Sequence, residues 1–225
     1  MTCHYVEGGG SVELLSVFGN DLNVVNVARV SMNKWHDEWE TEEDENDERL
    51  MTYLHKNEHT SPFRHQYLQF RIEAPIFVLR QWMKHTIGCG WNEQSGRYVS
   101  FSFECHKPDR WRKQSKSVKQ GSGGAVSESV DREATLIYDE QIRAAYDAYK
   151  RLLELGVCKE QARTVLPLSL MTKCIWTCSL QAFLHFLHLR LNSHAQVEIQ
   201  NYAQACLRAA RAEGSFENAL RVAGL

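Results

Sequence analysis

The amino-acid sequence predicts a single α+β domain in which a central, mostly antiparallel or mixed sheet is flanked by helices. Three observations support this fold class. Strand-like alternation of apolar and polar residues lies in the first half of the chain, helical spacing of apolar residues dominates the second half, and no internal repeat interrupts this order. A chain of 225 residues is long enough to bury one sizeable core. We therefore expect residues 1–225 to form one domain.

The first predicted elements are a strand and two helices. Apolar and polar residues alternate from Gly10 to Phe18, which predicts a strand that ends in a turn at residues 19–21. Asp21 is expected to cap the following helix, which extends to Val30. The acidic run 37–48 is expected to contain the start of a second helix, at the capping-box-like sequence Thr41-x-x-Asp44, and to carry no chemistry.

The middle of the chain returns to strand-like alternation. Residues 59–63 are expected to end the second helix, and the pattern from Gln66 to Ile72 predicts a strand. Pro75 is then well placed to open a helix from Ile76 to about His85.

Two glycines follow this helix and are expected to interrupt regular structure. Gly88 and Gly90 are expected to end the helix and to leave a loop that carries residues 92–97. The sequence 98–103, YVSFSF, predicts another strand. A candidate site at 92–97 would therefore lie between a helix and a strand.

The second half of the chain is predicted to be helical. The polar, basic and glycine-rich stretch 113–124 has the composition of a flexible surface loop. Helical spacing from 130 to 152 predicts a long amphipathic helix that stops at the C-cap Gly156. Two further helices are expected at about 180–191 and 194–212, the second opened by a capping box over 193–196.

Composition argues against several classes of protein. The net charge is −2 at pH 7, which gives no reason to expect nucleic acid or an acidic membrane surface as partner. No apolar run approaches the roughly 20 residues that cross a bilayer, and the start of the chain lacks a secretory signal, so a cytoplasmic protein is expected. The seven cysteines are scattered and never spaced as Cys-x-x-Cys, which indicates neither a disulfide framework nor a zinc ribbon.

Residues 92–98 are dense in groups that bind a phosphorylated ligand. Ser95 offers a hydroxyl, Gly96 an approachable amide, and Arg97 a guanidinium with a fixed donor fork. Arg163 and Arg190 each sit among apolar residues, where a bare charge is costly without an anionic partner. Structural salt bridges would explain these two arginines equally well.

Other chemistries find weaker support. His55 and His59 are four residues apart, but the order HKNEH differs from the zinc-binding His-Glu-x-x-His, and no metal is expected. Ser95 lacks the G-x-S-x-G surroundings of a hydrolase nucleophile. Cys89 is the only cysteine near the candidate loop, and it has no activating neighbour apart from Lys84 and His85.

The order of these motifs resembles the signature of the flavin-dependent (ThyX-type) thymidylate synthases. The resemblance lies in RQW at 80–82, a basic residue with His85, and NExSxRY at 92–98. Further similar blocks are VELLSVFGNDLNVVNVARVS at 12–31, HTSPFRH at 59–65, ARTVLPLSL at 162–170 and LRLNSHAQVEIQNYA at 189–203. The chain departs from the family pattern at Lys84, Thr86 and Gly90, and has one extra residue between His85 and Asn92. Ser179, Gln181 and His185 stand where family members often carry Asn, Arg and Asn.

The resemblance implies the reductive methylation of dUMP to dTMP, with 5,10-methylenetetrahydrofolate as carbon donor, FAD as hydride carrier and NADPH as reductant, and without an enzyme nucleophile. Arg190 would be the catalytic residue, stabilising the ionised uracil ring. The implied dUMP-binding residues are Gln81, Lys84, Glu93, Gln94, Ser95, Gly96, Arg97, Arg163 and Arg190. The implied FAD and folate residues are His59, Ser61, Lys84, His85, Thr86, Ile87, Asn92, Glu93, Ser179, Gln181, His185, Leu189 and His194.

The resemblance also implies a homotetramer whose active sites draw residues from more than one subunit. Two alternatives stay open at this point. The histidines would suit a metal-dependent hydrolase, and the altered Lys84, Thr86 and Gly90 would suit a nucleotide-binding module without redox function.

Overall fold

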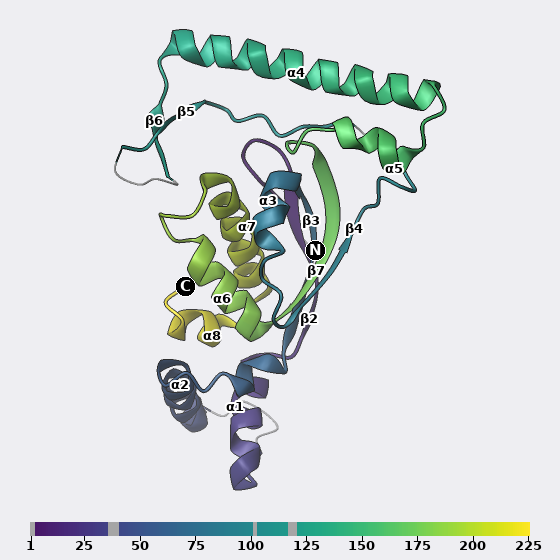
Figure 1. The fold of residues 1–225 in the computed structure, drawn as a ribbon. Coiled ribbons are helices and arrows are strands. Elements are labelled where there is room, and N and C mark those ends of the chain that lie inside the picture. Colours follow the sequence, from purple (N-terminus) through teal and green to yellow (C-terminus); the bar gives the residue numbers. More distant parts are fainter. Residues whose placement is uncertain (1–2, 36–40, 101–102, 117–120) are drawn as a thin grey trace.

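The computed structural model describes residues 3–35, 41–100, 103–116 and 121–225, except for the side chains of residues 41–45. One antiparallel sheet and a set of helices on its face form the body of the molecule (Figure 1). The strands of this sheet, in spatial order, are β1 (Cys3–Tyr5), β2 (Ser11–Phe18), β3 (Tyr67–Pro75), β7 (Met171–Ser179) and β4 (Cys89–Glu93). Every neighbouring pair is antiparallel, so the predicted α+β class with a mostly antiparallel sheet is confirmed.

The remaining elements surround this sheet. A separate two-stranded hairpin consists of β5 (Arg112–Gln114) and β6 (Ser122–Ala125). The helices are α1 (Asp21–Arg29), α2 (Thr41–Lys56), α3 (Ile76–Trp82), α4 (Glu128–Glu154), α5 (Lys159–Ala162), α6 (Leu180–Arg190), α7 (Val197–Glu213) and α8 (Glu217–Val222), with short 3₁₀ turns η1 (Val30–Met32), η2 (Ser61–Arg64) and η3 (Arg163–Val165). No helix in the described part of the chain is both long and apolar enough to span a bilayer.

The core lies between one face of the sheet and the helices α3, α6 and α7. In β3, Leu68, Phe70 and Ile72 are fully buried, whereas the alternate residues are more exposed, as the period of two in the sequence predicts. Trp82 of α3 stacks on Phe186 of α6 with ring centroids 4.7 Å apart and an interplanar angle of 8°. These aromatic contacts hold α3 and α6 together, and both helices carry predicted site residues at their C-terminal ends.

The helix α1 is capped by Asn20, not by Asp21 as predicted. Asn20 and Asn23 form a reciprocal capping box, which satisfies the first amides of the helix. The carboxylate of Asp21 is thereby free to accept hydrogen bonds from the backbone amides of Asn218 (2.7 Å) and Ala219 (3.0 Å), at the start of α8. Asp21 therefore joins the first helix to the last one.

The last acidic residues of the 37–48 run have structural partners. Asp47 forms an ion pair with Arg29 of α1, and Glu48 forms one with Arg221 of α8. The helix α2 begins at Thr41, whereas the capping contacts predicted for Thr41-x-x-Asp44 depend on side chains outside the described residues.

The segment from 83 to 103 differs from its prediction. The helix α3 ends at Trp82 instead of His85, and residues 89–93 pair with β7 as the strand β4, so Gly90 and Asn92 lie in a strand. The predicted strand at 98–103 is wrong for residues 98–100, because the Tyr98 amide donates to the Ser95 carbonyl (3.0 Å) and forms a turn. Residues 101–102 lie outside the described residues.

Two predictions in the second half also need correction. The ends of the stretch predicted as a flexible loop at 113–124 are strands of the β5–β6 hairpin, and residues 117–120 lie outside the described residues. The helix α7 begins at Val197, not at His194, because the Asn192 side chain and carbonyl accept the amides of His194 and Ala195 (2.9 Å each) and form a turn there. No capping box forms over 193–196.

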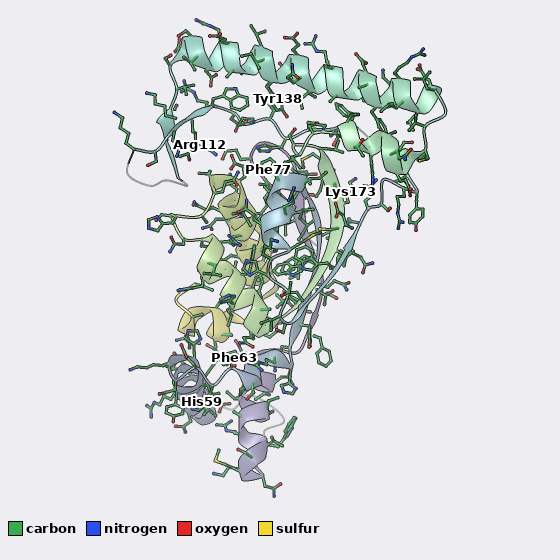
Figure 2. All side chains as sticks on the ribbon, in the orientation of Figure 1. His59, Phe63, Phe77, Arg112, Tyr138 and Lys173 are labelled. Carbon is green, nitrogen blue, oxygen red and sulfur yellow. The ribbon has the colours of Figure 1, made fainter. Side chains whose placement is uncertain are left out.

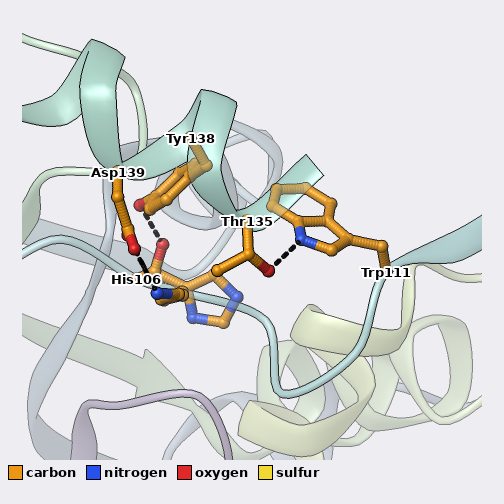
Figure 3. A network of polar contacts seen from close by, with 6 residues as sticks. His106, Trp111, Thr135, Tyr138 and Asp139 are labelled. Carbon is orange, nitrogen blue, oxygen red and sulfur yellow. Dashed lines mark hydrogen bonds and ion pairs between the residues drawn. The ribbon is translucent and has the colours of Figure 1, made fainter. Parts of the chain in front are cut away.

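The helix α4 is the long predicted helix, and it ends at the left-handed Gly156 as expected. Figure 1 shows that it runs along one side of the body, and Tyr149 is its one buried residue. Figure 3 shows polar contacts that attach it to residues 106–111: Thr135 accepts from the Trp111 indole (3.1 Å), and Asp139 pairs with the Lys107 ammonium (2.8 Å). The Tyr138 hydroxyl donates to the His106 carbonyl.

Candidate active site

A hollow of about 600 Å³ lies where β4 ends. The Gln94 amide donates to the Lys173 carbonyl (2.8 Å) and completes the strand pairing, after which residues 95–98 turn sharply. The Ser95 hydroxyl accepts the Arg97 amide at 3.3 Å within this turn. The residues that line the hollow are Glu93, Gln94, Ser95 and Arg97 from this segment, and Glu160, Gln161 and Arg163 from α5 and η3.

Two guanidinium groups converge on this hollow. Arg97 lies against the Tyr98 ring, 5.4 Å from its centroid, and Arg163 donates from Nε to the Glu160 carbonyl at 3.4 Å. Neither arginine forms an ion pair with a carboxylate of the described residues. Both side chains are exposed, so the expectation that Arg163 carries a costly buried charge is wrong. The two free cations and the Ser95 hydroxyl suit a phosphate group.

Arg190 is held at the C-terminal end of α6 by two hydrogen bonds. Its Nε donates to Nε2 of His85 at 3.0 Å, and its Nη2 donates to the Gln81 carbonyl at 3.1 Å. Burial lowers the pKa of Arg190, but a guanidinium stays protonated at neutral pH. The early end of α3 is what brings the His85 ring to this position. Arg190 is therefore fixed as a cation.

His85 is neutral in this arrangement. Burial, and to a smaller extent the nearby Arg190 and His185, together lower its pKa from 6.5 to about 4. A neutral imidazole has one nitrogen that accepts hydrogen bonds, and here that nitrogen faces Arg190.

Gln81, one of the predicted dUMP residues, is oriented by a second glutamine. Its Nε2 donates to Oε1 of Gln196 at 2.8 Å, immediately before α7 begins. Sequence reasoning assigned Gln196 to a capping box and gave it no part in the site, although it lies in one of the similar blocks. Lys84 is exposed in the turn after α3.

A third group of predicted residues lines a pocket of about 580 Å³ between α6, the end of α2 and the residues that follow α8. Its lining residues are Leu54, His55, Glu58, His59, Thr60, Phe63, Gln181, Leu184, His185, His188, Ala223 and Leu225. The pocket therefore brings together three residues of the predicted flavin and folate set, His59, Gln181 and His185. Figure 2 shows His59 and Phe63 close together near α2. The rings of His185 and His85 are 5.9 Å apart, which connects this pocket to Arg190.

The other predicted flavin and folate residues do not line this pocket. Ser179 is buried, and its hydroxyl caps α6 by accepting the Ala182 amide at 3.2 Å. His194 lies in a separate hollow with Arg110 and Lys113. The following predicted residues are exposed elsewhere on this chain: Ser61, Thr86, Ile87, Asn92 and Leu189.

Gly88 is required by its surroundings. Its φ of +71° favours glycine, and a Cβ at this position would lie 2.6 Å from the Ser179 hydroxyl. Gly90 has no such constraint, since nothing lies within 4 Å of its ideal Cβ.

The histidines of this pocket do not form a metal site. Although His55, His59, His185 and His188 all line it, no cluster of three or more His, Cys, Asp or Glu side chains in the described residues could hold a metal ion. Instead, His59 stacks on Tyr53 and His55 lies edge-on to Phe63. His55 and His188 are pocket residues that were not predicted as flavin or folate contacts.

The fold and these sites define an α+β protein with a hollow bordered by two exposed arginines, a fixed arginine that pairs with no carboxylate of the described residues, and a separate pocket lined by apolar and imidazole side chains. The chain belongs to the thymidylate synthase complementing protein family, whose model matches residues 13–213. The family resemblance seen in the sequence is thereby confirmed.

Relatives and solved structures agree with this assignment. The chain is 43% identical to the flavin-dependent thymidylate synthase of Kosmotoga olearia over 196 residues, which cover 87% of this chain and 83% of that protein. It is 36% identical over 217 residues to the enzyme of the same name from Treponema pallidum, covering 93% of this chain and 69% of the relative. A UMP/dUMP methylase from Streptomyces cacaoi, PolB, solved with 5-Br dUMP, has a TM-score of 0.84 and 30% identity, covering 97% and 96% of the two chains.

Proposed function

We propose that this protein is a flavin-dependent thymidylate synthase that reductively methylates dUMP to dTMP, with 5,10-methylenetetrahydrofolate as carbon donor, FAD as cofactor and NADPH as reductant. The observation that carries the proposal is the fixed Arg190 guanidinium, held by a neutral imidazole and a backbone carbonyl in a chain of this family.

The dUMP phosphate would bind in the hollow at the end of β4. The Ser95 hydroxyl, the Gly96 amide, Arg97 and Arg163 supply donors and positive charge there. Glu93 and Gln94 line the same hollow. Gln81, Lys84 and Arg190 would contact the uracil ring.

The residues proposed to bind the dUMP phosphate lie apart from Arg190 on one chain. This separation supports an active site that a second subunit completes. The exposed apolar residues of α4 also support association, since Leu136 is 70% exposed and Ile137 is 57% exposed. We propose a homotetramer, as in the family. Light scattering on the purified protein would measure its assembly.

Arg190 would act by electrostatic stabilisation. A fixed guanidinium beside the uracil ring favours negative charge as that charge develops, and it needs no reorganisation during the reaction. An enzyme nucleophile is not required. Burial raises the pKa of the Cys89 thiol, the cysteine nearest the predicted site, so the thiolate that a cysteine nucleophile needs is disfavoured.

The pocket between α2 and α6 fits a flavin or folate ring. Its lining includes the buried Leu54, Phe63 and Leu184 together with imidazoles and the Gln181 amide, and its volume is typical of cofactor sites. His59, Gln181 and His185 would hold the ring system. When bound, FAD supplies hydride transfer, and the protein supplies orientation. Of the other predicted contacts, the exposed residues would act at a subunit boundary; these are Ser61, Thr86, Ile87, Asn92, Leu189 and His194.

The purified protein tests this function directly. We expect flavin absorbance bands that bleach with NADPH under anaerobic conditions, and dTMP formation from dUMP and methylenetetrahydrofolate. The Arg190→Ala variant should keep its fold and its flavin but lose turnover. Colourless, folded protein that forms no dTMP would refute the proposal. Binding of dUMP without flavin would then identify a non-catalytic module, and stoichiometric metal with loss of activity in chelator would identify a hydrolase.

A further inference from the structure

Arg64, in the 3₁₀ turn η2, has a defined position although its side chain is exposed. Its Nε donates to Oε1 of Gln181 at 2.6 Å, and its Nη2 donates to the Thr60 hydroxyl at 2.8 Å. Both acceptors line the pocket that also contains His59 and His185. Arg64 therefore lies at the edge of this pocket, and neither sequence motifs nor the relatives' names assign it a role.

The two contacts orient Arg64 without neutralising it. Gln181 and Thr60 are uncharged, and Arg64 forms no ion pair with a carboxylate of the described residues. Its Nη1 donates to none of the described residues, so part of the donor fork is unused. An arginine whose rotamer is already fixed loses little entropy when it binds an anion. Arg64 is therefore oriented by neutral partners and keeps its full positive charge and a free donor group.

The side chains that line the pocket restrict the class of ligand that it can bind. Leu54, Phe63 and Leu184 offer apolar surface for a flat ring, and Glu58 is the one acid among the lining residues. A ligand that fills the pocket and reaches Arg64 would combine a planar heterocycle with an anionic group. Flavin nucleotides and folates both have this chemistry.

We propose that Arg64 is the anion-binding residue of this pocket, and that it binds a phosphate of the flavin nucleotide or a carboxylate of the folate. This proposal rests on the proposed function, which names those two ligands. Arg64 donates from its unused fork while Gln181 and Thr60 hold the rest of the guanidinium. Gln181 thus acts by positioning Arg64 as well as by lining the pocket.

The experiment compares Arg64→Ala and Arg64→Lys with the control Arg151→Ala, which removes an exposed arginine of α4 that pairs with Glu154. FAD, FMN and riboflavin are titrated against each variant, and binding is followed by flavin fluorescence. Arg64→Ala should weaken FAD and FMN binding roughly ten- to hundredfold, as for a lost hydrogen bond to a charged group, and should leave riboflavin binding unchanged. Arg64→Lys should bind FAD and FMN with an affinity between those of Arg64→Ala and the wild type. Arg151→Ala should bind all three flavins as the wild type does.

The same variants distinguish the two sources of the anion. If flavin binding is unchanged but the KM for methylenetetrahydrofolate rises in Arg64→Ala, the anion is the folate carboxylate, and the proposal stands. If riboflavin binding weakens as much as FAD binding does, or if neither FAD binding nor the folate KM changes, the proposal is overturned. Circular dichroism of each variant checks that the fold is retained.

A failure of the proposed function can be distinguished from a failure of the proposal for Arg64. Wild-type protein that binds no flavin and makes no dTMP would contradict the function, yet inorganic pyrophosphate would still test Arg64. Thermal stabilisation by pyrophosphate that disappears in Arg64→Ala and persists in Arg151→Ala supports the anion site. Equal behaviour of all three proteins overturns it.

Discussion

Arg190 and His85 form a cation–imidazole hydrogen bond, with Nε and Nε2 separated by 3.0 Å. The partner that fixes this guanidinium is therefore neutral. A carboxylate would hold Arg190 as firmly, but its negative charge would cancel much of the field that acts on a bound uracil ring. The structure thus combines a rigid orientation with an unopposed positive charge.

Replacing His85 tests the importance of this acceptor. His85→Leu removes it, and we expect kcat to fall on the order of a hundredfold as Arg190 loses its orientation, with a smaller change in the KM for dUMP. His85→Gln places an amide oxygen close to the position of Nε2 and should restore part of kcat. Steady-state kinetics measure both values. Equal losses of kcat in the two variants would contradict the positioning role.

The depressed pKa of His85 has a consequence for stability. Because the pKa is about 4 in the folded state and ordinarily 6.5, the unfolded state binds more protons between these values. The contribution of His85 is therefore fully present above about pH 6.5 and decreases as the pH falls toward 4. Urea unfolding at several pH values should show the wild type losing stability relative to His85→Gln over this interval. A constant difference would show that His85 titrates normally.

Asp21 should have the opposite effect on pH dependence. Burial raises its pKa from 3.8 to about 6, against the hydrogen bonds from Asn218 and Ala219, and the side chain is 5% exposed. The folded state then binds more protons than the unfolded state, so this contribution to stability falls as the pH rises from about 4 to about 6, by at most about 3 kcal/mol. Asp21→Asn keeps an acceptor and cannot ionise. The wild type should therefore lose stability relative to Asp21→Asn over this range, and parallel unfolding curves would contradict the raised pKa.

Arg163 should contribute to phosphate binding. Arg163→Ala removes one of the two guanidinium groups at the hollow and should raise the Kd for dUMP roughly ten- to hundredfold. Deoxyuridine, which has no phosphate, should bind both proteins equally. Calorimetric titration measures both ligands, and FAD fluorescence serves as the control for an intact cofactor pocket. A parallel loss of deoxyuridine binding would place Arg163 elsewhere.

Phe186 should be the most sensitive of the core positions around α3. It is fully buried, stacks on Trp82, and lies edge-on to His85 with ring centroids 5.3 Å apart. Phe186→Ala should destabilise the protein by about 3–5 kcal/mol through lost burial and the cavity left behind. The exposed Phe18→Ala, at 70% exposure, should change stability by about 0.5 kcal/mol or less. Chemical denaturation measures both, and similar losses would show that the stack contributes little.

The regular parts of the fold were predictable because local pattern and tertiary burial agree. The alternation in β2 and β3 matches the faces they present, and α4 ends at the glycine that the sequence indicates. The interior strand β7, in contrast, was not predicted. It is paired along both edges, and its sequence MTKCIWTCS does not alternate regularly between apolar and polar residues.

The element boundaries that were predicted wrongly depend on contacts between distant segments of the chain. No local signal ends α3 at Trp82, and beyond this end His85 accepts a hydrogen bond from Arg190, over a hundred residues away. Likewise, Asp21 reaches a helix at the other end of the chain. For the site, family motifs indicated Arg97, Arg163 and Arg190, but the orienting role of Gln196 depends on a contact that no spacing in the sequence reveals.

The helix α4 is attached to the body through Trp111, Lys107 and the His106 carbonyl, with Tyr149 as its one buried residue. Its separation from the sheet would therefore expose much less apolar surface than the opening of β3 or β7. In an isolated subunit, the amides of α4 should exchange with deuterium at a lower opening free energy than those of the central strands. If the proposed tetramer packs against this helix, assembly would slow the exchange, and order in α4 would then be thermodynamically coupled to assembly.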